Sequence, residues 1–238
     1  VKARVGLHLK VYESNREVSE ANRLLQASLQ EQLHRIEMEK RNVLYALTRV
    51  ARENAAYDEE HMERLCYNCR LLAEAMQLSS QFGHLISDAY IDMIEVAAPL
   101  CDLGNVAIPA SVLQKTDDLT EEEMAKIKTH TTVGGQILND VQEYGGSNDF
   151  LELSYEIAIG HHEYWDGSGY PAGISGNDIP LAAQIVSVAS AYCALTERRV
   201  YRESYDREEA LALMTEASGT KYNPHIIDIL RMIARRMR

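Results

Sequence analysis

The feature that most limits the possible folds is a long run without glycine or proline, from His8 to Phe82. Residues that favour helices, chiefly glutamate, leucine, arginine and alanine, are frequent in it, so we expect long helix throughout. Beyond Gly83 the pattern continues as helices joined by short loops. No useful length of the chain alternates apolar and polar residues with the period of two that a strand requires. The sequence therefore predicts an all-α fold, a helical bundle preceded by a long N-terminal helix.

Apolar residues in the first part of this run recur at the seven-residue spacing of a coiled coil. An extra step of four residues, from Leu25 to Leu29, is a stutter. Asn22 falls near the seam, where an amide can fix the register of two helices. The pattern favours a parallel homodimer formed through this helix, although an amphipathic helix packed on its own domain would show a similar stripe. The repeating positions are Val11, Val18 and Leu25, then Leu29, Ile36, Val43 and Val50, with Leu33 and Leu47 between them.

Local signals place the later helices and loops. Thr120 is followed by three glutamates, which is typical of a helix start in which Thr120 is the N-cap and Glu123 closes a capping box. Residues 145–148 and the glycine- and proline-rich segment 165–179 are predicted loops. Helices are expected over residues 84–100, 150–160, 181–195, 207–217 and 224–237.

The charge and composition exclude several classes of partner. The formal net charge is −12, which disfavours binding to nucleic-acid polymers or anionic membrane surfaces. No apolar run approaches the roughly 20 residues that span a bilayer, so we expect no membrane partner and a cytoplasmic location. Four cysteines in 238 residues do not make a disulfide scaffold. Because the chain begins at Val1 rather than Met, we expect a fragment of a longer protein.

Five acid or base groups stand out as candidate metal ligands: His61, Asp102, His130 and the adjacent His161 and His162. Imidazole and carboxylate are the usual ligands of divalent iron, manganese, zinc and nickel. Helical bundles build such sites from side chains that point inward from different helices. The candidates lie on separate segments, so only the fold could gather them, and each histidine could equally be an ordinary core or surface residue.

Three other motifs have a functional and a plain interpretation. Cys66 and Cys69 form a CxxC inside a predicted helix, without the second pair that a zinc site needs, so we expect core or surface cysteines. An aromatic residue on the rigid loop that begins at Trp165 could stack on a purine base, or could simply anchor the loop. Arg199 and Arg202 could clamp a phosphate, or could form a solvated basic patch.

The longest motifs resemble a known family. The stretch from His161, "HHEYWDGSGYPAGISGNDIPLAAQIVSVASAYCALTERRVYR", closely resembles the signature of HD-GYP domains, with Gly169-Tyr170-Pro171 as the GYP triplet. The upstream "DLGNVAIPASVLQKTDDLTEEEMAKIKTH" is similar to the segment that carries the HD dyad and the next metal histidine. The resemblance runs from about Asn54 to Leu230. It implies an all-α domain with two or three metal ions, often iron or manganese, that hydrolyses cyclic di-GMP to pGpG or GMP.

The N-terminal "VKARVGLHLKVYESNREVSEANRLL" resembles the last helix of a response-regulator receiver domain running into a linker. We therefore expect residues 1–53 to be the end of a receiver domain and a dimerisation helix, and residues 54–238 to be an HD-GYP-like domain. The parent protein would be a response regulator of two-component signalling.

The resemblance assigns roles to residues that match the family's motifs. His61, His130, His161 and His162 match metal histidines, and Asp102 matches the bridging aspartate of the HD dyad. The positions that hold the dinucleotide's base and phosphates are matched by Gly169, Tyr170, Pro171, Arg199 and Arg202.

Four positions depart from the family's pattern. The dyad histidine is Cys101, the phosphate lysine is Asn105, and two expected aspartates are Ser190 and Cys193. A thiolate at Cys101 could still bind a metal, but a serine hydroxyl is a poor ligand.

These replacements affect the metal content and the activity that we expect. We expect at most one tightly held divalent metal, iron, manganese or another, or none. The sequence then predicts a degenerate output module that binds cyclic di-GMP or a partner such as a GGDEF-domain protein, with little or no hydrolysis. The alternative is an active phosphodiesterase with a remodelled or mononuclear site.

Overall fold

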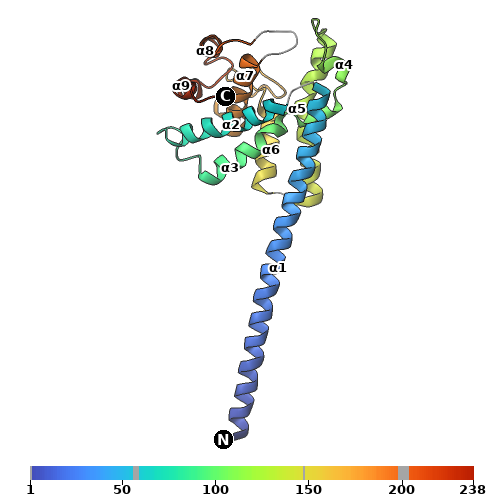
Figure 1. Cartoon of the computed structure of the whole chain (residues 1–238), viewed down its shortest axis with the longest axis vertical. Helices are drawn as coiled ribbons and strands as arrows, with labels where there is room; N and C mark the ends of the chain where they lie inside the picture. The colour runs from blue at the N-terminus through green and yellow to red at the C-terminus, as the bar shows by residue number, and fades with distance from the viewer. Residues whose placement is uncertain (1, 56–58, 147, 198–203) are drawn as a thin grey trace. The chain divides into compact units, whose positions relative to one another are not determined.

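The computed structural model describes all residues except 1, 56–58, 147 and 198–203. The chain divides into two compact units, Val1–Leu44 and Tyr45–Arg238. Helix α1 (Lys2–Ala55) makes up the described part of the first unit and runs on into the second (Figure 1). The described residues contain no strand, since their one β-type contact is an isolated bridge between Ser218 and Tyr222. The prediction of an all-α fold is therefore confirmed.

The apolar stripe of α1 is exposed in this single chain. The side chains of Val18, Leu25, Leu29, Leu33 and Ile36 are between 48% and 68% exposed. No other described segment of the first unit packs against this apolar stripe.

The expectation of long helix from His8 to Phe82 is confirmed over most of this run, in α1 and α2 (Glu59–Gln77), but is wrong at its end, where turns replace helix. The second helix ends well before Gly83 because Ser79 competes for its last hydrogen bonds. The hydroxyl of Ser79 donates to the carbonyl of Met76 at 2.7 Å and accepts from the amide of Phe82 at 3.1 Å. The absence of glycine and proline therefore predicted helix, but it did not predict the residue at which α2 ends.

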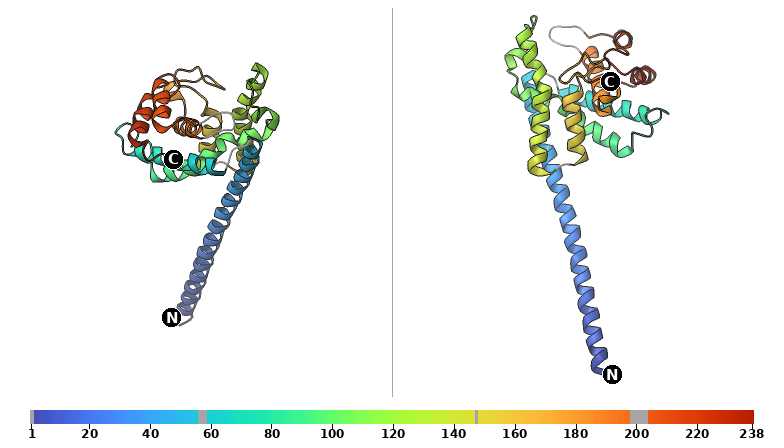
Figure 2. Two further views of the ribbon diagram at one scale, coloured as in Figure 1. Left: turned by 45° about the horizontal axis from the view of Figure 1, so that its top comes forward. Right: turned by 180° about the vertical axis from the view of Figure 1, so that it is seen from behind.

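The second unit is a bundle in which α2 packs on α3 and α7, while α5 packs on η1 and α6 (Figure 2). Helix α7 has a buried apolar surface on nearly every side, which places it at the centre of the core. After α2, the bundle consists of α3 (Asp88–Ala97), the 3-10 helix η1 (Ala98–Ala107), α4 (Ala110–Leu113), α5 (Glu121–Gly145), α6 (Asp149–Gly160), η2 (Gly176–Asp178), α7 (Leu181–Thr196), α8 (Arg207–Glu216) and α9 (Pro224–Ile233).

Most of the predicted boundaries agree with these helices. The capping box is present, with the amide of Glu123 donating to the Thr120 hydroxyl at 3.2 Å and the amide of Thr120 donating to the Glu123 carboxylate at 2.8 Å. Two expected helices are shorter. The segment expected over 84–100 becomes α3 followed by η1, whose Pro99 cannot donate a helical hydrogen bond. The last helix ends at Ile233, and turns follow.

A close backbone approach fixes η1 against α5. A Cβ atom on Gly104 would lie 1.9 Å from the carbonyl oxygen of His130, and one on Gly134 would lie 3.2 Å from the amide nitrogen of Gly104. Only glycine at position 104 allows this approach. The contact places the segment that carries Cys101 and Asp102 beside the helix that carries His130.

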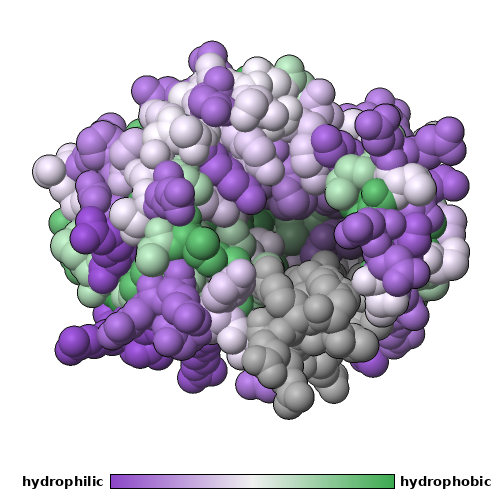
Figure 3. All heavy atoms as spheres, turned by 90° about the horizontal axis from the view of Figure 1, so that it is seen from above, coloured by the Kyte–Doolittle hydropathy of each residue, from purple (hydrophilic) through white to green (hydrophobic). Residues whose placement is uncertain are grey.

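The surface is polar over much of its area. Figure 3 shows one face on which hydrophilic side chains form most of the rim, while hydrophobic ones gather around a hollow. Within the described residues, no helix combines the length and the apolar character needed to cross a bilayer.

Candidate metal centre

Residues from five parts of the second unit line a cavity of about 250 Å³. His61 comes from the first turns of α2, Asp102 from η1, and His161 and His162 from the end of α6. Helix α7 supplies one wall, and Lys221 reaches the cavity from the segment between α8 and α9. The full lining is His61, Asp102, His161, His162, Ser187, Ser190, Ala191, Ala194 and Lys221.

Three histidines that are separate in the sequence lie together beside this cavity. One ring nitrogen from each of His130, His161 and His162 lies within 4.8 Å of the other two. The ring centroids of His161 and His162 are 4.2 Å apart, and His130 is 5.1 Å from His162 and 5.3 Å from His161. Helix α5 and the end of α6, which pack on each other, therefore bring together the predicted imidazoles.

Backbone carbonyls fix the tautomers of two of these rings. Nδ1 of His130 lies 2.7 Å from the carbonyl of Ile127, and Nδ1 of His161 lies 2.9 Å from the carbonyl of Ile157. A carbonyl oxygen only accepts, so both Nδ1 atoms must donate. The two Nε2 atoms then face each other at 3.3 Å. Two facing lone pairs require a shared cation, either a proton or a metal ion, and carbonyl-oriented imidazoles are typical of metal ligands.

Burial keeps His161 and His162 in the protonation state that binds metals. The pKa of His161 falls to about 4 because of burial and the neighbouring His130. Burial and the adjacent His161 also hold the pKa of His162 well below its usual value. Both rings are therefore neutral at pH 7, which is the protonation state in which imidazole coordinates a cation.

A second group of possible ligands shares His161. The Sγ of Cys101, a carboxylate oxygen of Asp102 and a ring nitrogen of His161 lie within 4.8 Å of one another. Asn105 donates to the Asp102 carboxylate at 3.0 Å and thereby orients it. Burial, and then the charge of Asp102, raise the pKa of the Cys101 thiol well above its usual value. The thiol is protonated unless a metal displaces its proton.

His61 reaches the cavity from another direction and is oriented by a carboxylate. Its Nδ1 lies 2.8 Å from the Glu197 carboxylate, at the end of α7. Next to this pair, Arg64 donates to the Thr196 hydroxyl at 2.7 Å, so the start of α2 is joined to the end of α7 twice. A carboxylate at Nδ1 directs the other nitrogen of a histidine toward a ligand.

The two expected aspartates of α7 are replaced at places that differ in exposure. Ser190 lines the cavity, so a neutral hydroxyl occupies a position on its wall. Cys193 is fully buried and accepts a hydrogen bond from Asn68 at 3.2 Å. Burial raises the pKa of Cys193 to about 11, which makes it an inert core residue.

The glycine-rich loop is held against the histidines by its backbone. A Cβ atom on Gly169 would lie 2.3 Å from the amide nitrogen of Tyr164, so glycine is required there. The amide of Tyr170 donates to the carbonyl of His162 at 3.0 Å, and its ring stacks on the His162 ring with centroids 4.8 Å apart. Pro171 follows through a cis peptide bond.

The structure describes some of the residues predicted to contact the ligand and leaves others outside the described part of the chain. In the structure the ring of Tyr170 lies on a histidine, and its contact with a base stays a prediction. Arg199 and Arg202 lie outside the described residues.

Sequence motifs did not indicate two residues that matter for this site. Glu197 orients His61 across 136 residues of sequence, and Lys221 supplies a positive charge to the cavity wall. Glu197 lies inside the quoted signature stretch and Lys221 lies outside it, but neither stands in a spacing pattern with the histidines that would mark its role. Neither cysteine of the CxxC of α2 belongs to a group of three possible metal ligands among the described residues, and Cys69 packs in the core.

Comparison with known proteins shows the family to which the chain belongs. The sequence pattern that defines the HD domain family matches residues 67–226. The chain belongs to the HD domain family. This HD domain also has relatives whose names agree with the HD-GYP resemblance of its motifs, so the expected family is confirmed.

Two curated relatives are similar over nearly the whole chain. A "Probable cyclic di-GMP phosphodiesterase" of Vibrio cholerae is 33% identical over 96% of this chain and 52% of its own length. The "Cyclic di-GMP phosphodiesterase response regulator RpfG" of Xanthomonas campestris is 34% identical over 97% of this chain and 57% of its own length. The chain thus spans about half the length of these relatives. Their names give no support to the expectation that an HD domain of this kind lacks hydrolysis.

A solved structure shows the same fold. That of an HDG"Y"P protein from Bdellovibrio bacteriovorus superposes with a TM-score of 0.54 at 22% identity. The match covers 73% of this chain and 52% of that one. The helical fold is therefore one already seen in a solved structure.

Proposed function

We propose that this HD domain binds cyclic di-GMP in the histidine-lined cavity and hydrolyses one of its phosphodiester bonds with the help of a divalent metal. The observation that carries the proposal is the pair of Nε2 atoms of His130 and His161, which face each other at 3.3 Å beside Asp102. Both rings have their other nitrogen committed to a carbonyl. The names of the relatives support the choice of substrate.

The residues present fit one divalent metal. His130, His161 and His162 would hold it, and Asp102, which lies within 4.8 Å of His161, would be a further donor. Imidazoles with one carboxylate suit iron, manganese or zinc. Such an ion supplies Lewis acidity toward the phosphodiester when it is bound. Asn105 orients the Asp102 carboxylate, and Tyr170 covers His162 on the side of the loop.

We expect turnover to be slow because of the residues around His61. Cys101 is buried with a raised pKa, and Ser190 offers only a hydroxyl to the cavity, so a second metal beside His61 would lack strong ligands. Loss of one preorganised electrostatic group costs about a hundredfold to a thousandfold in rate. The HD domain should therefore be a slow phosphodiesterase.

A turnover assay tests this proposal. The whole chain, purified without oxygen and loaded with Fe(II) or Mn(II), is incubated with cyclic di-GMP, and the products are separated by chromatography. We expect linear formation of pGpG or GMP that stops on chelation. Asp102→Ala should abolish it, whereas Asp118→Ala, which removes an exposed carboxylate from the loop before α5, should not. Product formation that survives both chelation and Asp102→Ala would contradict the proposal.

A second candidate function is binding without turnover. The observation that favours it is Ser190, which places a neutral hydroxyl on the cavity wall of α7. Under this candidate the HD domain retains the cavity as a recognition site for cyclic di-GMP. Saturable binding with no product after many hours would select it over the slow enzyme.

We further propose that the chain acts as the output part of a longer signalling protein and that α1 joins two copies. The Xanthomonas relative is named as a response regulator, and the chain spans 57% of its length. The exposed apolar stripe of α1, from Val18 to Ile36, is the support for dimerisation. A second copy would cover this stripe in the manner of a coiled coil.

A further inference from the structure

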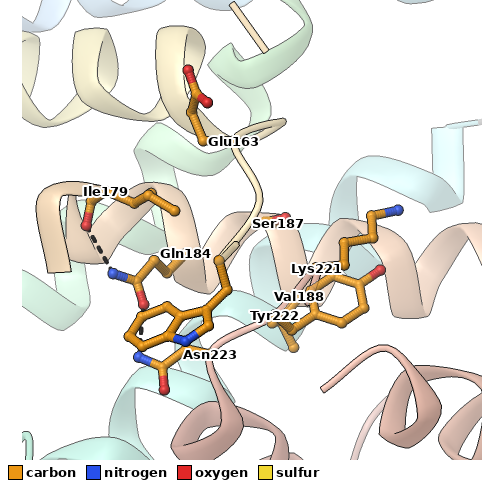
Figure 4. Close-up of a pocket in the computed structure, with 9 residues that line it drawn as sticks. Glu163, Ile179, Gln184, Ser187, Val188, Lys221, Tyr222 and Asn223 are labelled. Atoms are coloured by element: carbon orange, nitrogen blue, oxygen red, sulfur yellow. Dashed lines mark hydrogen bonds between the residues drawn. The ribbon is translucent and has the colours of Figure 1, made fainter. Parts of the chain in front are cut away.

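A lysine that no sequence motif singled out forms part of the cavity wall. Lys221 lies between α8 and α9 and lines both the histidine-lined cavity and a small neighbouring pocket of about 10 Å³. Figure 4 shows its side chain extending beside Tyr222 and away from Gln184 and Asn223. The side-chain amide of Asn223 donates to that of Gln184 at 2.9 Å, and Lys221 takes no part in this hydrogen bond.

The backbone around Lys221 is fixed on both sides. Its amide donates to the carbonyl of Ala217 at 2.9 Å, and its carbonyl accepts from the amide of Trp165 at 3.2 Å. The carbonyl of Thr220 accepts from the amide of Asp166 at 2.9 Å. The segment that carries the lysine is therefore joined to the start of the glycine-rich loop, and its side chain leaves from a defined position.

Aromatic rings hold the charged end of the side chain. The Nζ atom lies 5.1 Å from the centroid of the Tyr164 ring and 5.4 Å from that of Tyr222. Burial lowers the pKa of Lys221, but Tyr222 and Tyr164 raise it more, so the balance lies above the ordinary value. The group is therefore an ammonium at neutral pH, held in a position where its long side chain has lost much of its freedom.

This ammonium has no carboxylate against it in the part of the chain that the structure describes, where no acidic oxygen approaches within the 4.0 Å of an ion pair. It is also the one lysine or arginine among the described residues that line the cavity. The remaining polar wall consists of imidazoles, two hydroxyls and the Asp102 carboxylate. A half-buried cation that makes no ion pair with any described carboxylate favours an anionic ligand.

We propose that Lys221 is a ligand-contacting residue whose ammonium donates to a non-bridging oxygen of the phosphodiester held in the cavity. The proposal rests on the proposed function for the identity of the phosphodiester, but its chemistry requires only a phosphate oxyanion. An N–H donor that carries a full charge makes a stronger hydrogen bond to such an oxygen than a neutral donor. Asn105 cannot supply this charge, because it is neutral and its amide is committed to Asp102.

The first experiment measures binding of cyclic di-GMP by calorimetry to the full chain after metal removal, so that hydrolysis does not interfere. Three variants are compared: Lys221→Met, Lys221→Arg and the control Arg231→Gln. Arg231 is an exposed residue of α9, so the control removes one positive charge without touching the cavity. We expect Lys221→Met to weaken binding about ten- to a hundredfold, Lys221→Arg to weaken it less, and Arg231→Gln to leave it unchanged.

The second experiment separates this proposal from the choice of substrate. Inorganic phosphate is the probe, and the thermal melting temperature of each variant is recorded with and without it. We expect phosphate to stabilise the wild-type chain and Arg231→Gln, and to lose most of this effect with Lys221→Met. If phosphate stabilises the wild-type chain through Lys221 but the chain does not bind cyclic di-GMP, the contact between Lys221 and an anion stands and the proposed function is rejected.

Two results would overturn the role of Lys221. One is Lys221→Met binding cyclic di-GMP and responding to phosphate as Arg231→Gln does, even if its melting temperature without ligand is lower. That outcome would mean that the lysine only packs against its two tyrosines. The other is a wild-type chain that neither binds cyclic di-GMP nor is stabilised by phosphate.

Discussion

The charges of individual side chains decide what the cavity can hold. Burial keeps His161 and His162 neutral, the Asp102 carboxylate is oriented by an amide, and the positive charge comes from Lys221. At Cys101 and Ser190 the chain has a protonated thiol and a hydroxyl, which contribute no negative charge at neutral pH. The donor set near His130 is therefore much stronger than the one near His61.

This difference leads to a prediction about metal content. The purified chain should hold about one divalent ion, and Cys101→His combined with Ser190→Asp should raise the content toward two, because a carboxylate and an imidazole replace two weak donors. Elemental analysis after dialysis measures the content. The pair Cys66→His and Ser111→Asp, which makes the same chemical changes away from the cavity lining, is the control. Two well-occupied metals in the unaltered chain would contradict this account of the site.

The helices that carry the site depend on one glycine contact. With the Cβ of an alanine at position 104, the carbonyl oxygen of His130 would be 1.9 Å away, so η1 and α5 would have to separate. Because η1 carries Asp102 and α5 carries His130, such a separation would pull the metal donors apart. The close packing of η1 on α5 therefore also sets the distance between the proposed metal ligands Asp102 and His130.

We predict that Gly104→Ala destabilises the chain by at least about 3 kcal/mol, since backbone atoms cannot yield as a flexible side chain can. Gly135→Ala, on α5, is the matched control. Its added Cβ would meet side-chain atoms of Ile159 at 3.2 Å, which can shift. Urea unfolding followed by circular dichroism measures both. A Gly104→Ala chain as stable as Gly135→Ala would show that the contact is not needed.

Local chemistry made several of these elements predictable. The start of α5 follows from Thr120 and Glu123, whose reciprocal hydrogen bonds involve only neighbours in the sequence. The end of α2 did not follow, because the glycine- and proline-free run continues past it to Phe82 and the deciding group is one serine hydroxyl.

Some residues of the site could likewise be predicted from the sequence, and others could not. His130, His161 and His162 were visible because they lie in long ordered motifs, and His61 because it matches the first metal histidine of the family that these motifs resemble. Glu197 and Lys221 were not, because each acts through a contact with a residue far away in the sequence, His61 in one case and Tyr164 in the other.

At the scale of the whole molecule, the exposed stripe of α1 sets the expected assembly. Burying one leucine side chain contributes roughly 1.5–3 kcal/mol, so several that repeat every seven residues favour a second helix strongly. The stripe lies in the first unit, whereas the cavity lies wholly in the second. The proposed assembly and the proposed ligand binding would thus be carried by different units.

We predict that Leu25→Ser, Leu29→Ser and Leu33→Ser combined convert a dimer into a monomer, because they remove three successive apolar side chains from the stripe. Analytical ultracentrifugation of the full chain measures the mass. Gln26→Ser with Gln30→Ser, on exposed positions of the same helix, should leave the dimer intact. A monomeric unaltered chain would remove the support for dimerisation through α1.

The bond between the backbone of Trp165 and that of Lys221 has a spectroscopic consequence. Trp165 is the sole tryptophan of the sequence, and its amide is tied to the carbonyl of the lysine on the cavity wall. Its indole also borders the small pocket that Lys221 lines. The chain therefore carries its one indole beside the small pocket that adjoins the cavity, and selective excitation of this tryptophan reports on the surroundings of Lys221 without any attached label.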